Sequence, residues 1–287
     1  MNLKLLTMPR GLKDSNFATA INHGRVTVDE LWLGITRRCS LACAHCYCGP
    51  AQYLDMTDQT MDAIFEEFKR PTLIKIISPA GGELGTNLVA FDRFRVNLAR
   101  NKVEFDYTSF ITNGIAMQCP GSSKEFFDLA SETAKLSRFG MTKIRMTTND
   151  YLGDEYTRLG LDFEHHQALF IERGQKYSNL DISLIPYEDK KDFLIAYCGS
   201  GQNLSDVHMI FKPIANQKML QFAPDPDCPH RAGLKLMYFD TKGNITLPIS
   251  ERTWGDAHNL GNIHNIADMR TFYLEHGTEE ASEERTV

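Results

Sequence analysis

Short apolar runs alternate with amphipathic segments along the first two thirds of the chain. A run of about four to eight apolar residues is typical of a buried strand, and apolar residues spaced three or four apart are typical of a helix that packs on one face. The pattern predicts six strands, over residues 31–36, 73–77, 107–112, 143–148, 179–185 and 208–213.

Helices are predicted between these strands, because the spacing of apolar residues changes there and helix-capping residues appear. The first helix has Thr57 as its N-cap, followed by Met61, Ile64, Phe65 and Phe68 at helical spacing. The second carries Leu88, Phe91, Phe94 and Leu98 at the same kind of spacing. The third opens with a capping box from Ser122 to Glu125, and the last is predicted over 162–173. Before the first predicted core strand, residues 18–21 and 25–28 around Gly24 suggest a short hairpin.

The regular alternation of strand and helix predicts a parallel sheet built from βαβ units. Six units are fewer than the eight that close a full barrel. The predicted fold class is therefore α/β, a partial (β/α)6 TIM-like barrel. A doubly wound, Rossmann-like sheet is the alternative, although no GxGxxG follows any strand. In both folds, ligands bind at the carboxyl ends of the strands.

Three cysteines follow the first predicted strand at the spacing CxxxCxxC: Cys39, Cys43 and Cys46. Thiolates on one short loop can converge on a metal centre, and an iron–sulfur cluster usually has four protein ligands. A missing fourth ligand would leave one iron open to a substrate or cofactor. Two alternatives remain. Zinc prefers four tetrahedral ligands, for which Cys48 could be the fourth, and the three residues could be buried thiols.

The cysteine spacing resembles that of the radical S-adenosylmethionine (SAM) superfamily. The resemblance implies that Cys39, Cys43 and Cys46 hold one 4Fe–4S cluster and that SAM chelates its fourth iron. It also implies that the reduced cluster cleaves SAM to methionine and a 5′-deoxyadenosyl radical. An electron donor such as flavodoxin or ferredoxin would supply the electron.

A Gly-Gly-Glu sequence, Gly81, Gly82 and Glu83, follows the second predicted strand. Two glycines let a backbone approach a ligand closely, and a carboxylate can bind an ammonium group. In the resembling family this stretch binds the amino group of SAM. His45 stands between two of the cysteines, where the family has an aromatic residue or His near the adenine.

Further polar residues end the next strands. Asn113 lies in a Thr-Asn-Gly sequence that the family often shows near the cofactor, and we expect a mostly structural role. Thr147 and Asn149 lie on one face of a strand and can hydrogen bond to the SAM ribose or carboxylate. Here they replace the Ser and Asp that the family often has. Ser183 is a weaker candidate for a SAM contact. The sequence identifies no catalytic acid, base or hydrogen donor.

The C-terminal third has a different pattern, with a Pro-rich linker and a predicted hairpin over residues 236–247. It resembles the SPASM or twitch extension of peptide-modifying radical SAM enzymes. In those enzymes several cysteines hold an auxiliary cluster. Here Cys228 is alone, and Pro248 stands where the hairpin of the extension has a Cys. We therefore expect a small α+β cap that holds no cluster.

Four segments are predicted. They are an N-terminal segment over 1–30, a radical SAM core over 31–220, the SPASM- or twitch-like cap over 221–276, and a disordered tail over 277–287.

Composition narrows the class of protein. The 287 residues carry a net charge of −6 without a basic block, which argues against a nucleic-acid partner. No run of eighteen apolar residues or signal peptide is present, so we expect no membrane partner. Seven cysteines, an odd number, without an export signal indicate metal binding in the reducing cytoplasm.

The sequence thus predicts a radical SAM enzyme that abstracts hydrogen from a peptide or natural product. The same chemistry on a small metabolite or nucleoside is the alternative. A non-catalytic iron–sulfur electron carrier or sensor belongs to another class, and the Gly-Gly-Glu sequence counts against it because such a protein needs no SAM pocket.

Overall fold

The structure, a computed structural model, describes residues 17–46, 48, 50–69, 71–185, 195–196, 210–211, 220–224, 230–246 and 259–279. The first sixteen residues, Cys228, Pro248 and the tail beyond residue 279 lie outside the described residues, as does most of the predicted sixth strand.

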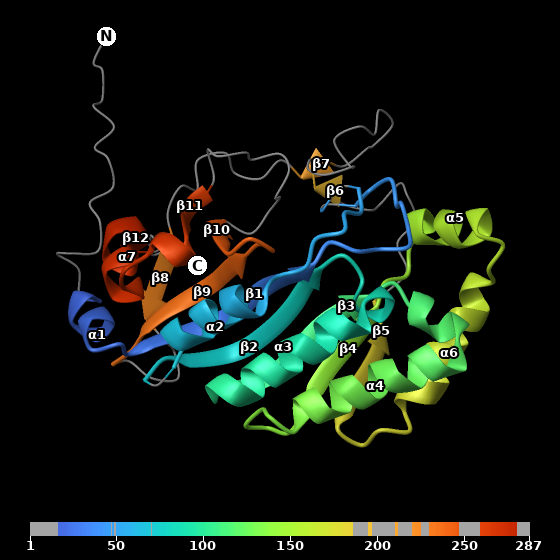
Figure 1. Cartoon of the computed structure of the whole chain (residues 1–287), viewed down its shortest axis with the longest axis horizontal. Helices are drawn as coiled ribbons and strands as arrows, with labels where there is room; N and C mark the ends of the chain where they lie inside the picture. The colour runs from blue at the N-terminus through green and yellow to red at the C-terminus, as the bar shows by residue number, and fades with distance from the viewer. Residues whose placement is uncertain are drawn as a thin grey trace, which may run out of the picture.

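Six parallel strands lie side by side in one large sheet (Figure 1). Their order is β9 (Ala232–Phe239), β1 (Val26–Thr36), β2 (Leu73–Gly81), β3 (Phe105–Thr112), β4 (Thr142–Met146) and β5 (Leu180–Leu184). Antiparallel strands β10 (Asn244–Thr246) and β11 (Asn259–Asn262) extend the sheet beyond β9. Within the described residues the sheet is not closed, because β5 and β11 lie at opposite edges. The α/β prediction is confirmed, and the open parallel sheet is consistent with a partial barrel.

The sixth parallel strand is not the predicted one. Residues Ile210–Phe211 form β7, which pairs with β6 (Ile195–Ala196) in a separate two-stranded sheet. β9, from the predicted cap, instead pairs with β1. Its Phe239 is fully buried and packs edge-to-face on Phe68, with 6.0 Å between ring centroids. Burial of these apolar side chains holds β9 in the main sheet.

The predicted hairpin of the C-terminal third is confirmed by the antiparallel pairing of β9 with β10. A further strand, β8 (Leu220–Pro224), also pairs with β9 in antiparallel fashion, and β12 (Gly277–Glu279) pairs in parallel with β8. The prediction of a disordered tail is therefore wrong for residues 277–279, which form a strand.

Helices pack along one face of the sheet (Figure 1). They are α2 (Asp58–Glu67), α3 (Leu88–Asn101), α4 (Pro120–Ala134) and α6 (Phe163–Gly174). The shorter helices are α1 (Ala18–Asn22), α5 (Asp150–Arg158) and α7 (Met269–His276), and the described residues also form 3-10 turns over Leu84–Thr86, Ile115–Gln118 and Ile263–Asn265. The predicted core residues Met61, Ile64 and Phe65 of α2 are fully buried. Within the part of the chain that the structure describes, no helix has both the length and the apolar character to cross a bilayer.

Of three local predictions, one is confirmed and two are wrong. Thr57 is the N-cap of α2, since its side chain accepts a hydrogen bond from Thr60 N at 3.1 Å. The capping box from Ser122 is wrong, because α4 begins at Pro120, which is favoured in the first turn of a helix. The hairpin over 18–28 is also wrong. Residues 18–22 form α1, and β1 begins at Val26, so this strand crosses the predicted boundary at residue 30.

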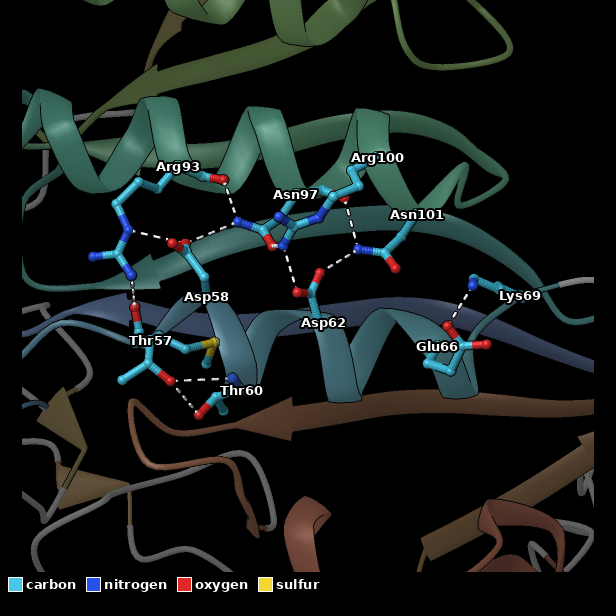
Figure 2. Close-up of polar contacts among 11 residues, drawn as sticks. Thr57, Asp58, Thr60, Asp62, Glu66, Lys69, Arg93, Asn97, Arg100 and Asn101 are labelled. Carbon is cyan, nitrogen blue, oxygen red and sulfur yellow. Dashed lines mark hydrogen bonds and ion pairs between the residues drawn. The ribbon is translucent and has the colours of Figure 1, made fainter.

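A polar network joins α2 to α3 (Figure 2). Asp58 accepts hydrogen bonds from Arg93 Nε and Asn97 Nδ2, both at 3.0 Å. Asp62 accepts from Asn101 Nδ2 at 2.7 Å and from Arg100. These contacts fix the position of α2, the helix that follows the cysteine loop.

Candidate functional site

The cysteine loop leaves the carboxyl end of β1 and returns beside it. Arg37 N donates to Leu54 O at 2.7 Å, and Met56 N donates to Ile35 O at 2.9 Å. Thr36 Oγ1 donates to Asp55 Oδ1 at 2.7 Å, and Asp55 also binds Arg38 at 2.9 Å. The base of the loop is therefore held by backbone and side-chain bonds together.

The three cysteines are half-buried thiols. Burial raises the pKa of the Cys39 and Cys43 thiols to about 12. Charge on Glu83 and then on Cys46 contributes to this rise at Cys39, and charge on Cys46 and Cys39 contributes to it at Cys43, so the three thiols lie within electrostatic reach of one another. Three thiolates would repel one another here unless a cation compensated them, and metal binding deprotonates thiols. The donor chemistry therefore fits a metal centre.

The described residues contain no group of three His, Cys, Asp or Glu side chains arranged around one metal ion. A single zinc ion needs all its thiolate sulfurs about 2.3 Å away. A cluster contains several irons, and its thiolates bind different irons and lie farther apart.

The two glycines of the Gly-Gly-Glu sequence allow a close approach, but to the protein's own backbone. A Cβ at Gly81, whose φ is +116°, would lie 2.1 Å from Thr36 O, and a Cβ at Gly82 would lie 2.1 Å from Arg38 O. Gly82 N donates to Thr36 O at 2.7 Å, and Glu83 N donates to Arg38 O at 2.8 Å. These contacts fix the end of β2 against the start of the cysteine loop.

The Glu83 carboxylate is buried, with the residue 2% exposed. It accepts hydrogen bonds from Gly85 N at 2.8 Å, Thr112 Oγ1 at 2.7 Å and Asn113 N at 2.7 Å. Burial raises the pKa of Glu83, and these three donors oppose the rise. Glu83 therefore ties the end of β2 to the end of β3.

Asn113 links the hydrogen bonds of Glu83 to the cysteines. Its Nδ2 lies 3.6 Å from Cys39 Sγ, and its carbonyl oxygen accepts from Tyr156 Oη at 2.9 Å. The structure thus brings together Cys39, Glu83 and Asn113, which belong to three separate motifs of the sequence.

The other predicted SAM contacts follow β4 or lie in β5. The prediction that Thr147 and Asn149 share a strand face is wrong, because β4 ends at Met146 and Asn149 is already the N-cap of α5. Thr147 N donates to Thr112 O at 2.9 Å. Asn149 is 1% exposed and caps α5, with Oδ1 accepting from Leu152 N at 2.9 Å, whereas its buried Nδ2 has no hydrogen-bond partner among the described residues. Ser183 is half-buried in β5, opposite Arg145 in register. Among the described residues, no hydrogen bond joins these three side chains to the cysteine loop.

The hydrophobic pattern did not predict α5, which packs against the cysteine loop. Leu152 and Tyr156 of α5 form an apolar cluster with Leu41 and Ile115, and Cys39 and Cys43 pack against this cluster. Asn149, an N-cap residue directly before a short amphipathic stretch, is the local signal that could have predicted this helix. The helix supplies an apolar wall beside the thiols.

His45 lies against the same helix. Its ring is 4.9 Å from that of Tyr151, at an interplanar angle of 34°. Burial lowers the pKa of His45 to about 4, so the imidazole is neutral at physiological pH. A neutral, flat ring at this position is compatible with the predicted contact to an adenine.

Comparisons with known proteins find similarity only at the level of solved structures. No protein-family model matches the chain, and no curated protein matches it significantly. The chain is similar to anSMEcpe with bound AdoMet and Cp18Cys peptide, with a TM-score of 0.49 and 11% identity over 86% of this chain and 80% of that chain. It is also similar to Streptococcus suis SuiB bound to the precursor peptide SuiA, with a TM-score of 0.35 and 11% identity over 79% of this chain and 61% of that chain. At these scores we base no conclusion on the similarities.

Proposed function

We propose that this chain is a radical SAM enzyme in which Cys39, Cys43 and Cys46 hold one 4Fe–4S cluster. The observation that carries the proposal is the meeting of Cys39, Glu83 and Asn113 at one point, at the carboxyl edge of an open parallel sheet. Ligands bind at this edge in such sheets. When bound, the reduced cluster would supply the electron that cleaves SAM and generates the radical.

The residues around the thiols have roles that follow from their contacts. Asn113 Nδ2 donates toward the Cys39 sulfur, and hydrogen bonds to sulfur tune an iron–sulfur centre. The apolar side chains of Leu41, Leu152 and Tyr156 exclude water on the side facing α5. A site that excludes water protects a reactive intermediate from side reactions.

SAM would lie over the ends of β2, β3 and β4. An ionised carboxylate has about four acceptor positions, and Glu83 uses three, which leaves one for the SAM ammonium. The buried Nδ2 of Asn149 is a donor for an oxygen of the ribose or carboxylate. The remaining proposed contacts are His45, Gly81, Gly82, Asn113, Thr147 and Ser183.

The proposed substrate is a peptide or natural product, and a small metabolite or nucleoside is the alternative. The sheet face opposite the helices supports a substrate surface. Ile111 of β3 is 49% exposed, and Arg145, opposite it in register, is exposed as well. In a closed barrel the side chains that point inward are packed in layers, so exposed side chains on this face support a surface open to a substrate. We also propose a cytoplasmic location and reduction by a flavodoxin or ferredoxin.

Anaerobic reconstitution with iron and sulfide tests the proposal. The holoprotein should bind about four irons per chain and, when reduced with dithionite, should convert SAM to 5′-deoxyadenosine. Replacing the three cysteines together with Ala should abolish both. A protein that assembles the cluster but neither binds nor cleaves SAM would instead be an electron carrier or sensor.

A further inference from the structure

The last turn of α5 directs a charged pair toward the cysteine loop. Glu155 Oε2 accepts a hydrogen bond from Ala42 N at 2.8 Å, and the same oxygen binds Arg158 at 2.8 Å. The Glu155 side chain is only 13% exposed, whereas that of Arg158 is 54% exposed. The carboxylate therefore faces the loop, and the guanidinium lies on its solvent side.

Ala42 directly precedes Cys43, so this hydrogen bond acts within the CxxxCxxC sequence. The preceding amide, Leu41 N, lies 3.5 Å from Cys39 Sγ and donates to it. Consecutive amides of the loop thus go to different acceptors, one to a cysteine sulfur and the next to Glu155. Glu155 fixes the direction of the peptide group between two of the proposed iron ligands.

The pair also places charge beside the cysteines. The hydrogen bond from Arg158, together with the weaker one from the Ala42 amide, holds the pKa of Glu155 below its usual range, so the side chain is ionised at neutral pH. The reduction potential of an iron–sulfur cluster depends on nearby charge, hydrogen bonds and solvent exposure. A negative charge disfavours the reduced, more electron-rich cluster, and a positive charge favours it.

We propose that Glu155 and Arg158 are a positioning pair that orients the cysteine loop and shifts the reduction potential of its cluster in opposite directions. This inference rests on the proposed function, because it requires that the loop hold a cluster. Glu155 is the dominant member, since its carboxylate contacts the loop directly and Arg158 acts across it. Glu155 is not assigned a contact with SAM or with substrate.

Neutral variants remove the charge at each position in turn. Glu155→Gln keeps an oxygen that can accept from Ala42 N but removes the negative charge. Arg158→Gln removes the positive charge and leaves the carboxylate unneutralised. Glu155→Ala removes both the charge and the acceptor. Glu172→Gln is the matched control, because Glu172 forms a similar pair, with Lys176 at 3.1 Å, on the exposed surface of α6.

The experiment begins with iron content and then measures the midpoint potential of the reconstituted holoprotein by a redox titration followed by electron paramagnetic resonance, without SAM. We expect a positive shift for Glu155→Gln, a negative shift for Arg158→Gln and no shift for the control. High salt should reduce both shifts, because salt screens charges that face solvent, as the Arg158 guanidinium does. Hydrogen exchange at Ala42 should accelerate in Glu155→Ala but not in Glu155→Gln.

Unchanged potentials in both neutral variants, or shifts of the same sign, would overturn the inference while leaving the cluster assignment intact. Equal exchange at Ala42 in Glu155→Ala and in the wild type would overturn the positioning role. If Glu155→Ala assembles no cluster, the two neutral variants still decide the effect of charge. If the wild type itself binds no cluster, the proposed function fails instead.

Discussion

Gly82→Ala should destabilise the protein at the start of the cysteine loop. The added Cβ would lie 2.1 Å from Arg38 O and 2.9 Å from Arg37 C, both backbone atoms that cannot rotate away. The chain would have to separate there, which strains or breaks the hydrogen bonds from Gly82 N to Thr36 O and from Glu83 N to Arg38 O.

The cost follows from three contributions. Forcing extra volume into a packed site costs about 1–3 kcal/mol, and each lost hydrogen bond costs about 0.5–1.5 kcal/mol. The reduced entropy of the unfolded chain offsets about 0.4–1 kcal/mol. With two hydrogen bonds affected, the net loss is about 1–6 kcal/mol, against the roughly 5–15 kcal/mol that stabilises a typical protein.

Urea unfolding followed by circular dichroism measures this loss, and iron content after reconstitution should fall as well. Gly121→Ala is the control, because a Cβ there, in the first turn of α4, meets nothing nearer than Cys119 Sγ at 3.9 Å. Its free energy of unfolding should stay constant or rise by up to about 1 kcal/mol. A Gly82→Ala protein within about 0.5 kcal/mol of the wild type would refute the steric argument.

Three further predictions concern the cofactor, the C-terminal third and pH. Glu83→Gln should weaken SAM binding about tenfold, measured by calorimetry on the holoprotein, because the SAM ammonium loses a charged acceptor; unchanged affinity would place the ammonium elsewhere. Cys228→Ala should leave iron content at about four per chain, and a fall from about eight would indicate a second cluster. The hydrogen bond from Arg93 lowers the pKa of Asp58. The stability that the ionised Asp58 side chain contributes is therefore fully present above its pKa in the unfolded chain and is lost as pH falls through its pKa in the folded protein. Between neutral pH and about pH 3, the wild type should therefore lose more unfolding free energy than Asp58→Asn, and equal losses would contradict this.

The local pattern predicted the elements whose apolar faces are regular. Phe91, Phe94 and Leu98 repeat at helical spacing and are buried in α3, as expected. The three motifs that meet at the site could also be identified, because each follows a strand and parallel strands end at one edge of the sheet. Neither inference needed contacts between distant segments.

The predictions fail where contacts between segments far apart in the sequence determine the structure. Nothing near residues 232–239 indicates that this strand pairs with β1, because the choice depends on how much apolar surface each edge buries. The partners that Glu83 finds at the end of β3 likewise depend on contacts between distant segments. The helix α5, by contrast, has a local signal, the N-cap Asn149. At Ser122 a local signal was overridden by another, since Pro120 started the helix earlier.

The pairing of β9 with β1 affects the order in which the protein can fold during synthesis. Val26 pairs with Ala232, so about 200 residues must be translated before this partner exists, which takes about 10–40 s at about 5–20 residues per second. During that time β1 presents an unpaired, apolar edge directly before the cysteine loop, and such edges pair readily with other chains. A nascent chain that stalls before residue 232 would therefore be prone to aggregation, and chaperone binding during this interval would protect it.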